Sequence, residues 1–110
     1  MEKIVTIEGQ EIRLKTHGNI PDLYEKHFGK SIFSEMRGMY KGGDDISPLN
    51  KFLWLAAKVA NPEILPIDKW NESFDSYPIL SVIEEVRELL NNLMNTGKKM
   101  TVPQKVGKKN

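Results

Sequence analysis

The fold is decided by one stretch, residues 47–62, which reads SPLNKFLWLAAKVANP. Its apolar residues recur at helical spacing, and Ser47-Pro48 is typical of a helix start, with a capping serine before a proline at the first helical position. Asn61-Pro62 indicates the end, because the residue before a proline avoids the helical region. The stretch therefore predicts an amphipathic helix of about three to four turns.

Two further helices are predicted on its C-terminal side. Pro66 opens a short helix that reaches Phe74. Pro78 opens the longest helix, and its end is expected at Gly97, since glycine is favoured just after a helix. This helix carries an apolar stripe made of Ile79, Val82, Ile83, Val86, Leu89, Leu90 and Leu93. We expect the stripe and the 47–62 helix to form the core.

On the N-terminal side, alternating apolar residues over 4–7 and 12–15 flank Gly9 and predict a β-hairpin with one buried face. Pro21 suits the first turn of a helix that Gly29 ends. Ser31 can cap a second short helix, in which Ile32, Phe33, Met36 and Tyr40 are available for packing. The predicted fold class is α+β, mainly α, with the N-terminal β-hairpin packed on four to five helices.

The charge of the 110-residue chain is unevenly spread. Its formal net charge is +1, yet all fifteen acidic residues lie at or before Glu88. Residues 1–96 hold eleven Lys and Arg and thus carry −4, whereas residues 97–110 hold five Lys and carry +5. The last fourteen residues offer too little apolar surface to offset the entropy of ordering. We therefore expect one domain over 1–96 and a flexible basic tail over 97–110.

Catalysis, metal binding and cofactor binding are not indicated. The chain has no cysteine, which excludes disulfides, iron–sulfur clusters and cysteine nucleophiles, and its only imidazoles are His17 and His27. No phosphate loop or dinucleotide motif is present. Glu84, Glu85 and Glu88 indicate a solvated helix face. No apolar run approaches the roughly 20 residues of a membrane span, and no leader is evident. We expect a protein that is not an enzyme, with no cofactor and no metal.

Candidate contact residues for a partner protein are apolar or soft. Trp54 and Leu55 lie off the main stripe of the 47–62 helix, so that helix either docks another chain or is covered on both sides by its own core. Met36, Met39 and Tyr40 suit an adaptable binding surface, and filling gaps in the core is the alternative for them.

The order of these elements resembles the tail assembly chaperones of long-tailed bacteriophages and prophages. The hairpin reads IEGQEIRL over 7–14, a Gly-Lys-Ser-Ile segment covers 29–32, and the apolar helix ends in Ala-Asn-Pro-Glu at 60–63. A Leu- and Val-rich final helix completes the pattern. The resemblance spans roughly residues 3–95 and rests on the order of helix-boundary patterns.

The resemblance implies a function without catalysis. Such chaperones bind the long tape measure protein in the host bacterial cytoplasm, keep it soluble and help to recruit the major tail protein during assembly of the tail tube. Self-association is left open. An alternative is a small nucleic-acid-binding regulator that uses the basic tail, although the acidic body would repel phosphates.

Overall fold

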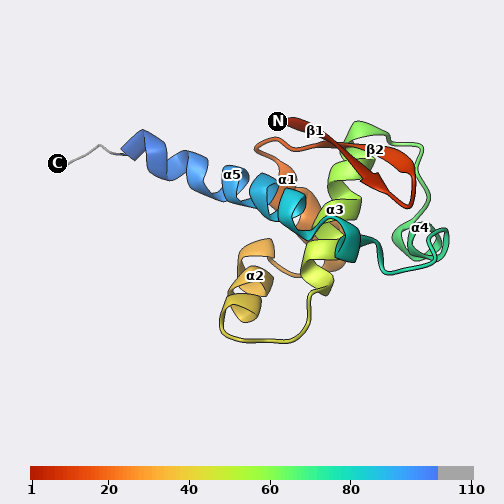
Figure 1. Ribbon diagram of the computed structural model, residues 1–110. Coiled ribbons are helices and arrows are strands. Elements are labelled where there is room, and N and C mark those ends of the chain that lie inside the picture. The colour runs from red at the N-terminus through yellow and green to blue at the C-terminus, as the bar shows by residue number, and fades with distance from the viewer. Residues whose placement is uncertain (102–110) are drawn as a thin grey trace.

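The computed structural model describes the backbone of residues 1–101 and the side chains of residues 1–95. Over this range the elements follow in the order β1 (Glu2–Ile7), β2 (Gln10–Lys15), α1 (Ile20–Phe28), α2 (Ile32–Tyr40), α3 (Ser47–Ala60), α4 (Ile67–Glu72), the 3-10 turn η1 (Pro78–Ser81) and α5 (Ile83–Thr101) (Figure 1). The predicted fold class is confirmed: an N-terminal hairpin precedes five α-helices, and the fold is α+β and mainly α.

The hairpin forms because its turn accepts a left-handed backbone. The strands β1 and β2 are antiparallel, and Ile7 pairs with Gln10 across a two-residue turn. Glu8 and Gly9 have φ values of 52° and 82°, the positive values that a type I′ turn requires. Val5 and Ile7 are buried while Ile4 is exposed, so one face of the sheet packs on the core, as the alternation predicts.

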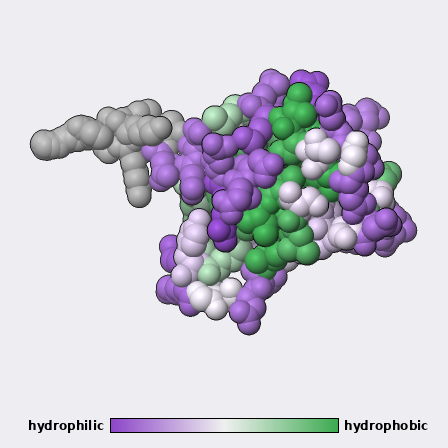
Figure 2. Space-filling model, in the orientation of Figure 1, coloured by the Kyte–Doolittle hydropathy of each residue, from purple (hydrophilic) through white to green (hydrophobic). Residues whose placement is uncertain are grey.

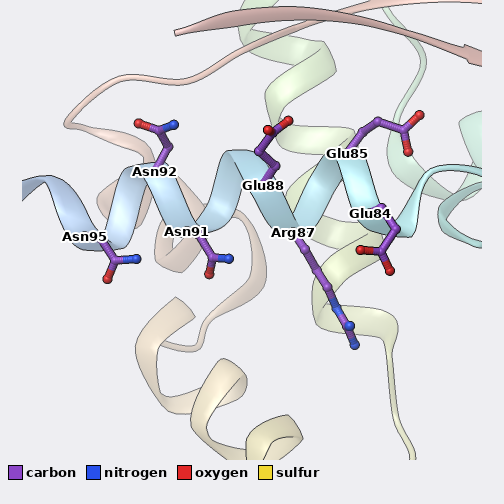
Figure 3. A pocket seen from close by; sticks show the side chains of 7 residues that line it. All are labelled: Glu84, Glu85, Arg87, Glu88, Asn91, Asn92 and Asn95. Atoms are coloured by element: carbon purple, nitrogen blue, oxygen red, sulfur yellow. The ribbon is translucent and has the colours of Figure 1, made fainter.

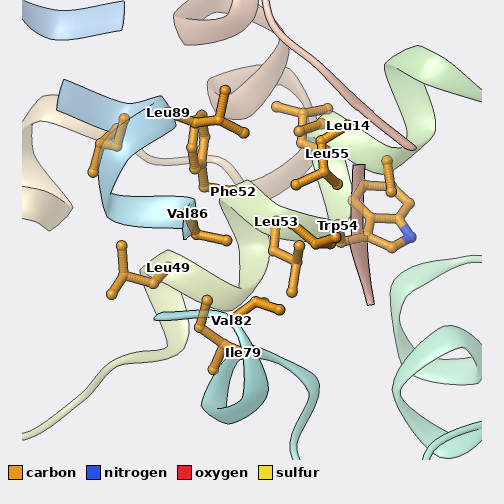
Figure 4. Close-up of a cluster of buried hydrophobic side chains, with 14 of the residues drawn as sticks. Leu14, Leu49, Phe52, Leu53, Trp54, Leu55, Ile79, Val82, Val86 and Leu89 are labelled. Atoms are coloured by element: carbon orange, nitrogen blue, oxygen red, sulfur yellow. The ribbon is translucent and has the colours of Figure 1, made fainter. Parts of the chain in front are cut away.

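Helix α3 is the centre of the molecule, because it is buried on almost every side. All residues from Phe52 to Ala57 are buried. The helix packs against β2, α1 and α5, with α2, α4 and η1 also in contact. Figure 4 shows the side chains of α3 between those of β2, η1 and α5. Of the two arrangements the sequence allows for α3, the structure has the one in which the core of the same chain covers both sides.

A buried asparagine joins α3 to its neighbours. The side chain of Asn50 is 1% exposed. Its Nδ2 donates a hydrogen bond to Oδ1 of Asn71 on α4 at 3.0 Å, and its Oδ1 accepts one from the backbone N–H of Ile79 in η1 at 3.2 Å. The N–H groups at a helix start have no acceptor within the helix. The side chain of Asn50 therefore supplies the acceptor that the buried N–H of Ile79 needs.

The prediction that Pro78 opens the longest helix is wrong. Pro78 opens η1 instead, and Val82, with φ −139° and ψ 27°, separates this turn from α5. The interruption lets Pro78 and Ile79 enter the core while α5 follows its own direction. The apolar stripe is nonetheless in place, because Val82, Val86, Leu89 and Leu90 are buried.

The expected helix end at Gly97 is also wrong, because α5 continues to Thr101. A glycine inside a helix costs only about 1 kcal/mol relative to alanine, and the lysines beside Gly97 are good helix formers. The first five residues of the predicted flexible tail are thus helical. Residues 102–110 of that tail lie outside the described residues.

Candidate partner-binding surface

The described residues hold no group of three or more His, Asp or Glu side chains that could bind a metal ion. His17 is exposed, and its Nδ1 accepts a hydrogen bond from the backbone N–H of Asn19 at 3.1 Å. The His27 ring lies edge-on to Trp54, with centroids 5.3 Å apart. Burial and the charges of Lys58 and Lys26 lower the pKa of His27. His17 thus accepts a hydrogen bond within its own loop, and His27 packs against Trp54.

Three of the five predicted partner-binding residues lie in the core. Met36, Trp54 and Leu55 are 2%, 4% and 1% exposed. The indole Nε1 of Trp54 donates a hydrogen bond to the backbone oxygen of Leu65 at 2.9 Å, and the ring of Phe28 covers it edge-on. Of the two arrangements left open for α3, this is the one in which neighbouring elements cover both of its sides. A partner could therefore reach these side chains only if the helices separated.

The other two predicted residues, Met39 and Tyr40, lie near the end of α2 and differ in exposure. Met39 is partly buried against the core, whereas Tyr40 is 68% exposed. Phe33, one of the residues that the sequence assigns to packing, is 50% exposed on the same helix. Two aromatic side chains seven residues apart share one face of a helix. That spacing is the sequence signal that could have separated Phe33 from the packing residues.

The rotation of α2 is fixed by its inner side. Ser31 caps the helix, because its Oγ accepts hydrogen bonds from the backbone N–H groups of Phe33 and Ser34. Ile32 and Met36 then enter the core. These contacts leave the rest of the helix surface to solvent, and Phe33 and Tyr40 lie there on the flank beside Met36.

A carboxylate completes the inner side of α2. Oε1 of Glu35 accepts hydrogen bonds from the hydroxyl of Tyr24 on α1 and from Nζ of Lys51 on α3. Burial alone would raise the pKa of Glu35, but these two hydrogen bonds and the charges of Lys51 and Lys30 outweigh it and lower that pKa. Burial and the bond to Glu35 raise the pKa of Tyr24. Glu35 is therefore ionised and Tyr24 protonated at neutral pH.

A hollow of about 600 Å³ runs along the outer side of α5. Every side chain that lines it comes from this one helix, as Figure 3 shows: Glu84, Glu85, Arg87, Glu88, Asn91, Asn92 and Asn95. Ligand sites are typically enclosed and largely apolar, and this surface is neither. The solvated carboxylates at this surface agree with the predicted solvated face, and Lys3 neutralises Glu88 at 2.6 Å.

A second hollow, of about 420 Å³, lies between the hairpin and α3. Its walls come from residues 10–13, from Ala57 and Ala60 at the end of α3, and from Ile64 and Trp70. It holds Glu11 and Arg13 as its charged groups, and these have opposite signs. In the view of Figure 2, hydrophobic residues gather on the middle of the body, beside the hydrophilic surface of α5.

No described helix has both the length and the apolar character needed to cross a membrane. No family model matches the sequence, and comparisons with curated proteins and with solved structures find no similar protein.

Proposed function

We propose that this chain is a tail assembly chaperone of a long-tailed phage or prophage, which binds the tape measure protein and assists assembly of the tail tube without catalysis. The observation that carries the proposal is the order of elements: a hairpin with the IEGQEIRL pattern, α1 running into Gly29-Lys30-Ser31-Ile32, α3 ending at Asn61-Pro62, and a long final helix.

The physical properties of the described residues support a binding role. The helix α2 enters the core through Ile32 and Met36 and leaves the rings of Phe33 and Tyr40 exposed. A tape measure is long, helical and prone to aggregate before the tube encloses it, so a helix-in-groove or helix-on-helix contact would protect it. Many copies bound weakly along one chain would gain affinity through multivalency.

The site of action in this proposal is the cytoplasm of the host bacterium, where the tape measure protein and the major tail protein are made. The alternative, a nucleic-acid-binding regulator, depends on the basic tail. Residues 1–96 carry eleven basic and fifteen acidic side chains, so the body would repel phosphate groups. The chaperone is therefore the function we favour.

Co-expression tests the proposal. The chain, carrying an affinity tag, is produced together with the tape measure protein of the same genome, which the proposal expects to be encoded near this gene. The two are purified through the tag in parallel at low and at high salt. We expect that protein to co-purify in stoichiometric or higher-order amounts. Recovery of nucleic acid instead, in amounts that fall steeply with salt, would favour the regulator.

A further inference from the structure

An exposed strip on α2 combines two aromatic rings with an arginine. Phe33 and Tyr40 are 50% and 68% exposed, and Arg37 lies between them, four residues after the first and three before the second. Residues at these spacings are neighbours on one helix face. We call Phe33, Arg37 and Tyr40 the aromatic–arginine face.

The charge of this face is positive and unneutralised. Within the described part of the chain, Arg37 makes no ion pair or side-chain hydrogen bond. The one acid of α2, Glu35, points to the other side of the helix, where Lys51 and Tyr24 bind it. The acids after α2, Asp44 and Asp45, line a hollow on the flank of Ser34 and Gly38. Asp45 also accepts a hydrogen bond from the backbone N–H of Ser47.

The composition of the face matches that of binding hot spots. Tyrosine, phenylalanine and arginine are enriched at the centres of protein interfaces. The guanidinium group binds a carboxylate through two parallel hydrogen bonds, and the rings beside it would exclude water from that pair. An unpaired cation between two exposed rings therefore favours a partner in which an acidic side chain is flanked by apolar side chains.

We propose that the aromatic–arginine face binds an acidic amphipathic helix of a partner protein, with a carboxylate on Arg37 and aliphatic side chains on Phe33 and Tyr40. The identity of that partner as the tape measure protein rests on the proposed function, whereas the preference for an acidic helix does not.

The acidic outer side of α5 in a second copy of this chain fits the face less well. The outer side of α5 supplies the carboxylates Glu84, Glu85 and Glu88, but the other residues that line it are Arg87 and three asparagines. It offers no apolar side chain to cover Phe33 and Tyr40, so charge complementarity alone would hold such a contact, and salt would screen it.

The test uses the full chain and two synthetic peptides. Each is a capped alanine-based helix of about 18 residues with leucines at helical spacing on one face. In one the leucines are flanked by glutamates, and in the other by lysines. Binding is followed by fluorescence anisotropy of the labelled peptide at about 0.15 M salt, so that nonspecific attraction between charges is screened.

We expect the glutamate peptide to bind the wild-type chain in preference to the lysine peptide. Arg37→Glu should weaken binding of the glutamate peptide by at least roughly tenfold, because it replaces an attraction with a repulsion, and should strengthen binding of the lysine peptide. The double variant Phe33→Ala/Tyr40→Ala should weaken both peptides. Lys69→Glu, an equal change of charge at an exposed residue of α4, is the control and should alter neither affinity by more than about twofold.

The proposal is overturned if the two peptides bind equally, or if Arg37→Glu and Lys69→Glu have the same effect. Thermal melts establish whether each variant is folded. If Arg37→Glu is unfolded, Arg37→Gln is used in its place. The glutamine variant should weaken the glutamate peptide without strengthening the lysine peptide. Two results together would assign the face to a second copy: the wild type self-associates and Arg37→Glu does not, and the glutamate peptide does not bind. If the tape measure protein does not co-purify but the chain still prefers the glutamate peptide, the proposed function is rejected and the preference of the face for an acidic helix stands.

Discussion

Nζ of Lys51 on α3 lies 3.2 Å from Oε1 of Glu35 on α2, and the same oxygen accepts the hydroxyl hydrogen of Tyr24 on α1. One carboxylate oxygen thus joins three helices. The Glu35 side chain is 15% exposed, so the pair is largely withdrawn from solvent. Because this contact and the burial of Ile32 and Met36 hold one side of α2 inward, they also determine which residues of α2 face outward.

Removing the charge of Glu35 should destabilise the protein. Glu35→Gln keeps the shape of the side chain but leaves Lys51 without its counter-ion, and we expect the free energy of unfolding to fall by about 1–2 kcal/mol. Glu84→Gln, at an exposed position on α5, is the matched control and should change stability by less than about 0.5 kcal/mol. Urea unfolding measures both, and equal effects would contradict the anchoring role of Glu35.

The carboxylate of Glu35 should also make the stability of the fold depend on pH. The pKa of Glu35 is lower in the folded protein than its ordinary value, so its ionised form stabilises the fold at neutral pH. This contribution is complete above the ordinary carboxyl pKa of about 4.3 and is lost as the pH falls through the lower, folded pKa. The stability gap between wild type and Glu35→Gln should therefore narrow as the pH is lowered from about 6 to about 3. A gap that is constant with pH would contradict this assignment.

Replacing Asn50 should lower the free energy of unfolding by more than replacing Glu35 does. Asn50→Ala removes the acceptor for the buried N–H of Ile79 and the donor to Asn71, and an unsatisfied buried group costs about 1–3 kcal/mol beyond the lost packing. Asn71→Ala removes only one bond of the pair and should cost about 1 kcal/mol. Thermal melts that rank Asn71→Ala as the more damaging variant would refute the role of Asn50.

Acidic substitutions locate the core. Leu53 is fully buried, Ile83 is partly buried and Leu80 is 57% exposed. Leu53→Asp should abolish cooperative folding, because an isolated charge would enter the core, and Ile83→Asp should destabilise the protein strongly. Leu80→Asp should be tolerated. The near-ultraviolet circular dichroism of the three variants reports this order, and a folded Leu53→Asp would show that the core is assigned wrongly.

The hairpin turn provides a further test. Gly9 has φ 82°, and a Cβ added there would meet no atom within 4 Å, so any cost of Gly9→Ala comes from the backbone alone. We expect a loss of about 1 kcal/mol. Gly18→Ala is the control, since Gly18 has no positive φ and equally open surroundings. It should be neutral or slightly stabilising. Equal stabilities of the two variants would argue against the type I′ turn.

The local signals in the sequence predicted most of the fold. Alternation around Gly9 predicted the hairpin, and the proline pairs predicted both ends of the helix over 47–62 within a residue or two. The prediction from Pro78 was wrong, because the proline preference for a first helical turn applies equally to a 3-10 turn, here one of four residues.

The candidate surface was less predictable. A helix with apolar residues on all sides has the same sequence pattern whether a partner or its own chain covers it, so the burial of Trp54 and Leu55 depends on where the hairpin, α1 and α4 pack. Phe33 looked like a packing residue for a similar reason. Its exposure follows from the rotation of α2, which Glu35 fixes through contacts 11 and 16 residues away in the sequence.

The measurement that tests the central claim most directly is the solubility of the tape measure protein. The tape measure protein of the same genome is expressed alone, with the wild-type chain, and with Leu53→Asp as an unfolded control. Its share in the soluble fraction is quantified after centrifugation. A chaperone predicts that this share rises with the dose of the wild-type chain and does not rise with the variant. A share that is unchanged by the folded wild-type chain would contradict the proposed function.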